Sequence, residues 1–248
     1  MSYSVILPTF NENNHIVDLI ESISNIFIKQ NILFEILVID DSSTDGTKET
    51  VENFSKANKY LKLISRNNKK RNLAESINEG LESAKHTNII WMDADFQHPP
   101  KYILKFIDLS IANEVIICSR FLTDSRRYFG QANSAKEINE NQSQFFNRLC
   151  NFFLFKDVTD YTSGFICLKK KILEDYKLNG YYGDYFVNLI TFLKKKNIYI
   201  YEIPFKDELR ASGFSKTVVR INLKYLYLCY RYFLTLMKNI FVKLNYFN

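Results

Sequence analysis

The feature that most constrains the fold is an alternation of short, β-branched apolar runs with longer amphipathic stretches, which begins at the first residues of the chain. Residues 14–28, 44–54 and 184–196 have helical patterns, with apolar or helix-starting residues at the expected positions. Such repetition predicts an α/β fold, in which a doubly wound, mostly parallel sheet carries helices on both faces. The runs predicted to be strands are 4–7, 35–39, 61–64, 88–92, 115–118, 164–168 and 198–203.

Composition places the chain among ordinary globular proteins. Its 248 residues are 46% hydrophobic and 24% charged, which is enough apolar material for one good-sized core. The four cysteines form no C-x-x-C pair, so neither a zinc knuckle nor a disulfide framework is expected, and a reducing compartment fits best. We read no signal peptide at the start of the sequence. The polar stretch 123–141 has little apolar periodicity and is predicted to be a long surface loop.

The last segment, residues 216–248, is basic and rich in aromatic residues. Its apolar stretch is interrupted by charged residues, so it is not expected to span a membrane. As a C-terminal amphipathic helix it favours either the headgroup layer of a membrane or packing against the protein core or a dimer partner. We therefore separate it from a main domain at 1–215. Its basic stripe consists of Lys216, Arg220, Lys224, Arg231 and Lys238.

Acidic residues follow three of the predicted strands directly. They occur in the segments 8–12, 40–43 and 93–95. In an open parallel sheet, ligands bind beyond the carboxyl ends of the strands, so these acids are expected at one edge. Acids gathered there repel one another unless a cation lies among them, and carboxylates two residues apart suit Mg²⁺ or Mn²⁺ together with substrate phosphates. Asp93 and Asp95 are the natural pair of metal ligands.

The segments 4–12, 38–47 and 92–100 together resemble glycosyltransferase family 2. Within that family they resemble most the dolichol-phosphate mannose synthase branch of polyprenyl-phosphate sugar synthases. The resemblance implies a GT-A-type fold and a nucleotide-sugar-binding catalytic domain at 1–215. It continues through the motifs at 119–121, 160–165, 202–204, Arg210 and 215–216.

Position by position, the resemblance implies the following site. The nucleoside of the donor would be framed by Pro8, Phe10, Glu12, Ile39 and Asp41. The diphosphate would be held through the metal by Asp93, Ala94 and Asp95, with Gln97 as an extra ligand. Phosphate contacts would come from Arg120, Arg210 and Lys216. The charge argument agrees, because cations beside a diphosphate stabilise the negative charge that grows on the leaving group.

The implied reaction is inverting, metal-dependent transfer of a sugar from a nucleotide-sugar, GDP-mannose-like or a UDP-sugar, to a dolichyl or undecaprenyl phosphate. The enzyme would lie peripherally on the cytoplasmic face of a membrane. The alternative role of its last helix is contact with a second copy in a homo-oligomer. The glycine-rich segments usual in this branch are missing at 71–75 and 123–124, so the base and sugar of the donor stay open.

Two alternatives remain. A related transferase would act on a glycan or lipid-glycan hydroxyl and would need a base, for which Asp184 is the candidate, although an acid there is equally expected at a helix N-terminus. A non-catalytic nucleotide-sugar-binding module or a Rossmann oxidoreductase is the other, but no G-x-G-x-x-G follows the first strand. The lysine runs 169–171 and 194–196 lack interleaved aromatic residues, so no nucleic-acid partner is predicted.

Overall fold

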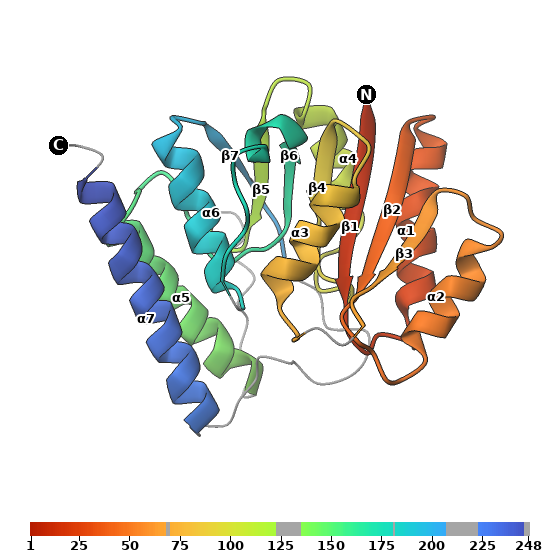
Figure 1. Ribbon diagram of the computed structural model, residues 1–248. Coiled ribbons are helices and arrows are strands. Elements are labelled where there is room, and N and C mark those ends of the chain that lie inside the picture. Colours follow the sequence, from red (N-terminus) through yellow and green to blue (C-terminus); the bar gives the residue numbers. More distant parts are fainter. Residues whose placement is uncertain (68–69, 123–134, 181, 207–222, 246–248) are drawn as a thin grey trace.

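The computed structural model describes residues 1–67, 70–122, 135–180, 182–206 and 223–245. Within these ranges the core is a seven-stranded sheet with the strand order β3-β2-β1-β4-β6-β5-β7 (Figure 1). The strands are β1 (Ser2–Thr9), β2 (Leu33–Asp40), β3 (Leu61–Ser65), β4 (Asn88–Trp91), β5 (Val115–Ser119), β6 (Ile166–Lys169) and β7 (Ile200–Pro204).

The sheet is parallel except at β6. Strand β1 pairs in parallel with β2 and β4, β2 pairs in parallel with β3, and β5 pairs in parallel with β7. Strand β6 lies between β4 and β5 and is antiparallel to both. The carboxyl ends of β1 to β5 and of β7 therefore meet at one edge, as the predicted mostly parallel sheet requires.

Helices cover both faces of the sheet, which confirms the predicted α/β architecture (Figure 1). One face carries α1 (Ile16–Lys29), α2 (Thr47–Ser55) and α4 (Tyr102–Leu109). The other carries α3 (Leu73–Ser83) and α6 (Asp184–Lys195), with α5 (Ala135–Phe153) and α7 (Leu223–Leu244) outside α6. A short 3₁₀ turn, Lys170–Leu173, follows β6.

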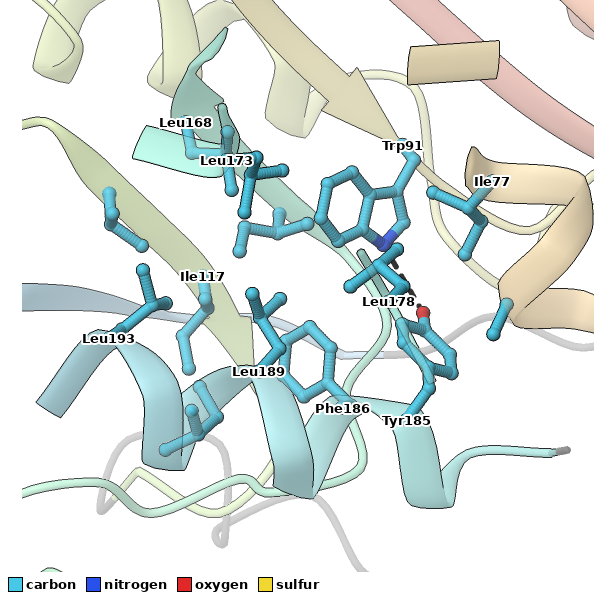
Figure 2. Packing of buried hydrophobic residues seen from close by; sticks show 14 of the residues in the cluster. Ile77, Trp91, Ile117, Leu168, Leu173, Leu178, Tyr185, Phe186, Leu189 and Leu193 are labelled. Atoms are coloured by element: carbon cyan, nitrogen blue, oxygen red, sulfur yellow. Dashed lines mark hydrogen bonds between the residues drawn. The ribbon is translucent and has the colours of Figure 1, made fainter. Parts of the chain in front are cut away.

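Alternation along the strands divides the core into two layers. In β2, Ile36 and Val38 face the layer under α1, whereas Leu37 and Ile39 face the layer under α3 and α6. In the second layer, the indole N–H of Trp91 donates to the hydroxyl of Tyr185, 3.2 Å away (Figure 2). Burial of each such side chain stabilises the fold by about 1.5–3 kcal/mol.

Helix α3 approaches β1 closely because Gly80 has no side chain. A Cβ atom at this position would lie 2.5 Å from Cγ2 of Ile6, which is fully buried in the strand below. The close contact brings the first turn of α3 beside the carboxyl ends of β1 and β2.

One expectation about the second half of the chain changes, and another lies outside the described residues. Helix α5 begins at Ala135, inside the stretch predicted to be a surface loop, while residues 123–134 lie outside the described part. The later part of the helix packs on the core through Phe146, Leu149 and Cys150, and this tertiary packing forms a helix where the first half lacks an apolar period. The proposed boundary at 215/216 lies outside the described residues.

Helix α7 packs on the protein through a face that the basic stripe did not reveal. Tyr232 stacks edge-on against Phe146 with ring centroids 4.7 Å apart, and Leu236 and Asn239 are buried. Arg231 pairs with Asp184 instead of pointing to a membrane. None of the described helices combines the length and apolar character needed to cross a bilayer.

Candidate functional site

Three residues with left-handed backbone conformation mark the ends of the central strands. Asn11, Ser42 and Phe96, which follow β1, β2 and β4, have φ values of 55°, 66° and 64°. Non-glycine residues rarely adopt this conformation, which costs on the order of 1–3 kcal/mol and persists where the surroundings demand it. The sharp turns place the adjoining backbone and acidic side chains at the carboxyl edge, where a ligand of an open α/β sheet binds.

The loops after β1 and β2 are tied together by hydrogen bonds. The Asn11 amide donates to Ser43 Oγ at 2.9 Å, and the Thr44 amide donates back to Asn11 Oδ1 at 2.8 Å. The Glu12 amide donates to Thr47 Oγ1 at 2.9 Å. The Glu12 carboxylate is buried and lies 2.9 Å from the imidazole of His15. Phe10, Glu12 and Asp41, predicted to frame the nucleoside, are therefore adjacent.

Asp41 is held by a buried cation that the sequence analysis did not identify. Arg66 Nη1 lies 2.5 Å from Asp41 Oδ1, and the Asn72 amide donates to Oδ2 at 3.0 Å. The Arg66 Nε atom in turn donates to Glu79 Oε1 at 3.0 Å. Each oxygen of a carboxylate accepts more than one hydrogen bond, so Asp41 keeps the capacity to accept a donor from a base. The available signal was an arginine directly after β3, at the same edge.

Phe10 carries a second arginine on its ring. The guanidinium carbon of Arg71 lies 3.7 Å from the ring centroid, which is a stacked cation–π contact at the mouth of the site. Pro8 is half-buried on β1, while the Ile39 and Ala94 side chains are buried in the core. For Ile39 and Ala94, any contact with a ligand would therefore come from the backbone.

His98 shapes the loop that contains the paired aspartates. The Asp93 amide donates to His98 Nδ1 at 2.9 Å, which places the imidazole proton on Nε2. The ring is buried and stacks on Phe165, with centroids 4.8 Å apart and planes 8° from parallel. The Gln97 amide donates to Asp95 Oδ1 at 3.0 Å. His98 thus positions this loop from below.

The paired aspartates suit a hard divalent cation. Within the described part of the chain, the half-buried Asp93 carboxylate forms no hydrogen bond or ion pair, which leaves its oxygens available. Among those same residues, no group of three or more His, Cys, Asp or Glu side chains gathers as a metal centre. A cation at Asp93 and Asp95 would complete its shell with diphosphate oxygens and water, as Mg²⁺ commonly does. The Gln97 side chain adds an amide oxygen nearby.

Arg120 follows β5 and is fixed by a buried acid. Its Nε and Nη2 atoms donate to the two oxygens of Asp160 at 2.8 and 2.9 Å, and Nη2 also donates to Thr162 Oγ1 at 2.8 Å. The Asp160 side chain is fully buried and that of Arg120 is 22% exposed. A bidentate pair of this kind holds a guanidinium plane in one orientation at the site edge.

Asp184 begins α6 and is 2% exposed. It accepts from the Tyr182 amide at 2.8 Å and lies 3.4 Å from both Arg231 Nη2 and Thr235 Oγ1 of α7. Burial, together with the charge of Asp93, raises the pKa of the adjacent Tyr185. Asp184 therefore lies on the side of the site, engaged with α7. Arg210 and Lys216 lie outside the described residues.

An acid-rich carboxyl edge on a doubly wound sheet, with paired aspartates after the fourth strand, is the arrangement of a GT-A-type fold. Comparison with known families agrees with this class. The chain belongs to glycosyl transferase family 2, whose family model matches residues 4–177.

Two relatives carry the name dolichol-phosphate mannosyltransferase. The protein of Pyrococcus furiosus is 29% identical over 232 residues, which cover 93% of this chain and 63% of that protein. The protein of Mycosarcoma maydis is 35% identical over 106 residues, 41% of this chain and 36% of its own length. The chain thus spans less than two thirds of either relative.

Among solved structures, glucosyl-3-phosphoglycerate synthase from Mycobacterium tuberculosis has a similar fold. The complex of that enzyme with Mn²⁺, uridine diphosphate and phosphoglyceric acid matches with a TM-score of 0.69 and 16% identity. The match covers 96% of this chain and 78% of that chain. At this identity the likeness shows the fold alone.

Proposed function

We propose that this family 2 glycosyltransferase moves a sugar from a nucleotide-sugar to a polyprenyl monophosphate, with inversion at the anomeric carbon. The observation that carries the proposal is the carboxyl edge itself, where Asp93 and Asp95 lie beside the Phe10–Glu12 loop and Asp41. The relatives named dolichol-phosphate mannosyltransferase favour a polyprenyl phosphate acceptor.

The donor nucleoside would lie over Phe10 and donate hydrogen bonds to the carboxylates of Glu12 and Asp41. Arg66 orients the Asp41 carboxylate, since the two side chains are buried together and in contact. Asp93 and Asp95, with Gln97, would hold Mg²⁺ or Mn²⁺ at the diphosphate. When bound, the cation neutralises the charge that develops on the leaving diphosphate. Arg120, and Arg210 and Lys216 from the C-terminal part, would contact phosphate oxygens.

The position of Asp184 supports a phosphate acceptor over a hydroxyl. A hydroxyl acceptor requires a base, whereas a phosphate monoester with a second pKa of about 6 arrives largely ionised. Asp184 is almost completely buried and accepts from the Tyr182 amide with Arg231 beside it, so it is poorly placed to take a proton from a substrate. An acceptor that needs no base suits this arrangement.

A second set of observations supports a peripheral position on a membrane, for which we propose the cytoplasmic face. On α7, exposed apolar side chains recur every three or four residues and form one stripe opposite the face that packs on α6. Exposed phenylalanines of α5 add to it, since α5 and α7 lie side by side (Figure 1). We call this the α5/α7 apolar face: Phe145, Phe152, Tyr227, Tyr230, Leu234, Met237, Phe241 and Leu244.

Charge favours an anionic lipid surface over a second copy as the partner of this face. From residue 209 to the end, the sequence contains seven lysines and arginines and neither aspartate nor glutamate. Two copies that met through this segment would bring like charges together, whereas anionic headgroups complement them.

The test is turnover with defined substrates. The protein would be incubated with Mn²⁺ or Mg²⁺ and GDP-mannose or UDP-glucose, with and without a short-chain polyprenyl phosphate, and nucleoside diphosphate release would be measured. Release that depends on the lipid phosphate is the expected result. Release only with a saccharide acceptor would replace the proposal with the hydroxyl reaction, and no release with any pair would contradict it.

Asp95→Ala is expected to lower this turnover by at least about a hundredfold, because it removes one carboxylate from the cation and the leaving group loses stabilisation. Asp108→Ala, an exposed aspartate on α4, is the control and should keep wild-type turnover. Full activity of the Asp95 variant would contradict the assigned role.

A further inference from the structure

Glu202, in the edge strand β7, carries a carboxylate that contacts a different part of the chain. Both oxygens accept from the Thr159 amide, at 3.0 and 2.9 Å, and Oε1 also lies 3.3 Å from the Asp160 amide. Strand β7 holds the residue in register opposite Ile117 of β5. The carboxylate therefore caps two consecutive N–H groups of the segment that leads into β6.

That segment carries the acid that binds Arg120. Asp160 Oδ2 accepts from the backbone amide and Nε of Arg120 at 3.1 and 2.8 Å. Asp160 Oδ1 accepts from Arg120 Nη2 at 2.9 Å and from the Thr162 amide at 3.0 Å. Asp160 is 0% exposed, so its position is set by the backbone that Glu202 holds. The contacts form one line from Glu202 through Asp160 to the Arg120 guanidinium.

We propose that Glu202 is a positioning residue, which sets the orientation of the Arg120 guanidinium by fixing the backbone of Thr159 and Asp160. The benefit of that orientation for a donor or acceptor phosphate rests on the proposed function. The line of contacts itself is a property of the folded chain.

Capping these two backbone amides does not require a charged residue. Two amide donors can be satisfied by a neutral acceptor, and a second carboxylate beside the buried Asp160 costs free energy through repulsion and desolvation. In return, an ionised acceptor forms stronger hydrogen bonds than a neutral one and holds the amides more tightly. Such a cost is common where a residue serves a site rather than stability.

The surroundings of Glu202 make its hydrogen bonds with the Thr159 and Asp160 amides sensitive to pH. Burial raises the pKa of Glu202 to about 7, with a further rise from Asp160, while the hydrogen bonds from Thr159 and Asp160 oppose the shift. The ionisable groups that face it are Asp160 and Tyr161, with Arg120 on the far side of Asp160. On protonation, one oxygen becomes a donor facing amide donors, so the cap loosens.

The experiment compares Glu202→Gln, which keeps an acceptor but does not titrate, with Glu202→Ala, which removes the cap. Glu114→Gln, an exposed glutamate that precedes β5, is the matched control. Two readouts are taken between pH 6 and 8: hydrogen exchange of the Arg120 Nε–H by ¹⁵N NMR without substrate, corrected for intrinsic exchange, and turnover of GDP-mannose or UDP-glucose with short-chain polyprenyl phosphate.

Wild type should show a rise in Nε–H protection and in turnover through about pH 7, which Glu114→Gln shares. Glu202→Gln should lack this step in both readouts. Dividing the wild-type turnover by the turnover of Glu202→Gln at each pH removes the effect of acceptor titration, which both proteins share. Glu202→Ala should lose protection at every pH and lower turnover by roughly ten- to a hundredfold, as misplaced catalytic groups do.

The inference is overturned if Glu202→Gln keeps the wild-type step, or if Glu202→Ala folds and leaves protection unchanged. If Glu202→Ala does not fold, the step in Glu202→Gln decides. Changed protection without turnover of any donor would uphold the positioning role and contradict the proposed function. Normal turnover in both variants would support the proposed function and contradict the positioning role.

Discussion

Buried carboxylates at the carboxyl edge differ in what neutralises them. Asp41 is paired with Arg66, Asp160 with Arg120, and Asp184 lies beside Arg231. Breaking a pair buried on both sides, as Asp41–Arg66 is, by removing one partner typically costs about 3–5 kcal/mol, because the other charge is left uncompensated. Asp93, in contrast to these three, is half-buried and forms no ion pair within the described chain. A cation that binds together with the ligand therefore fits best at Asp93.

The raised pKa of Glu202 also predicts how the free energy of unfolding depends on pH. Its pKa is about 7 in the folded protein and near 4.5 when unfolded, so the folded state binds more protons between these values. The contribution of this group is present below pH 4.5 and is lost as the pH rises to about 7. The free energy of unfolding of wild type minus that of Glu202→Gln, from urea titrations, should therefore fall over this window and level off above it. A difference that is constant or rises with pH would contradict the assignment.

Residue roles could be predicted from the sequence where the relevant neighbours are local. Asp93 and Asp95 are two positions apart after a buried strand, so their convergence follows from the backbone alone. The partners of Asp41, Arg120 and Asp184 lie 25, 40 and 47 positions away in the sequence. No periodicity reveals such pairs. For this reason Arg66 was absent from the predicted site, and Asp160 and Glu202 appeared only within the motifs 160–165 and 202–204, without a role in it.

At the scale of elements, the strands and the C-terminal helix were predictable, whereas the start of α5 and the orientation of α7 were not. Each predicted strand overlaps an observed one because a buried parallel strand needs an apolar run. The antiparallel direction of β6 depends on the connection through α5, which crosses residues that carry no apolar period. For α7, the pattern predicted amphipathicity but not orientation, since aromatic residues occur on both of its sides and only packing on Phe146 and α6 selects the inner one.

The exposed side of α7 is expected to bind lipid. Met237 and Phe241 are 47% and 67% exposed. The double variant Met237→Ser/Phe241→Ser should bind vesicles containing anionic lipid at least about tenfold more weakly, because each buried apolar side chain contributes about 1.5–3 kcal/mol. Its melting temperature should stay that of wild type. Co-sedimentation with vesicles and thermal unfolding measure the two quantities.

Leu236→Ser provides the matched control on the opposite side of the same helix. Leu236 is 4% exposed, so this variant should lower the melting temperature through loss of core packing while the lipid-binding side stays intact. Equal vesicle binding by the double variant and wild type would remove α7 as the docking element.

Across the whole molecule, the two edges of the sheet perform different tasks. At the amino edge, the buried Glu35 accepts from Ser4 Oγ and from the Lys85 amide, both at 2.7 Å, and so ties β1, β2 and the end of α3 together. Both donors are thus satisfied within the protein. At the carboxyl edge, strained turns, the stacked Arg71 and the Asp93 carboxylate, which has no ion pair among the described residues, leave interactions for a ligand. Residues that stabilise the fold and residues that are available to a ligand thus lie at opposite ends of the strands.

This separation predicts opposite outcomes for one substitution at each edge. Glu35→Ala leaves two buried donors without an acceptor and should destabilise the fold by about 1–3 kcal/mol, with unchanged turnover at temperatures where the protein is folded. Asp93→Asn removes a charge beside Asp95 and should keep or raise the melting temperature, while turnover falls by at least about a hundredfold. Melting temperature and turnover would be measured on the same preparations. Loss of turnover in folded Glu35→Ala, or normal turnover in Asp93→Asn, would show that the two edges are not independent.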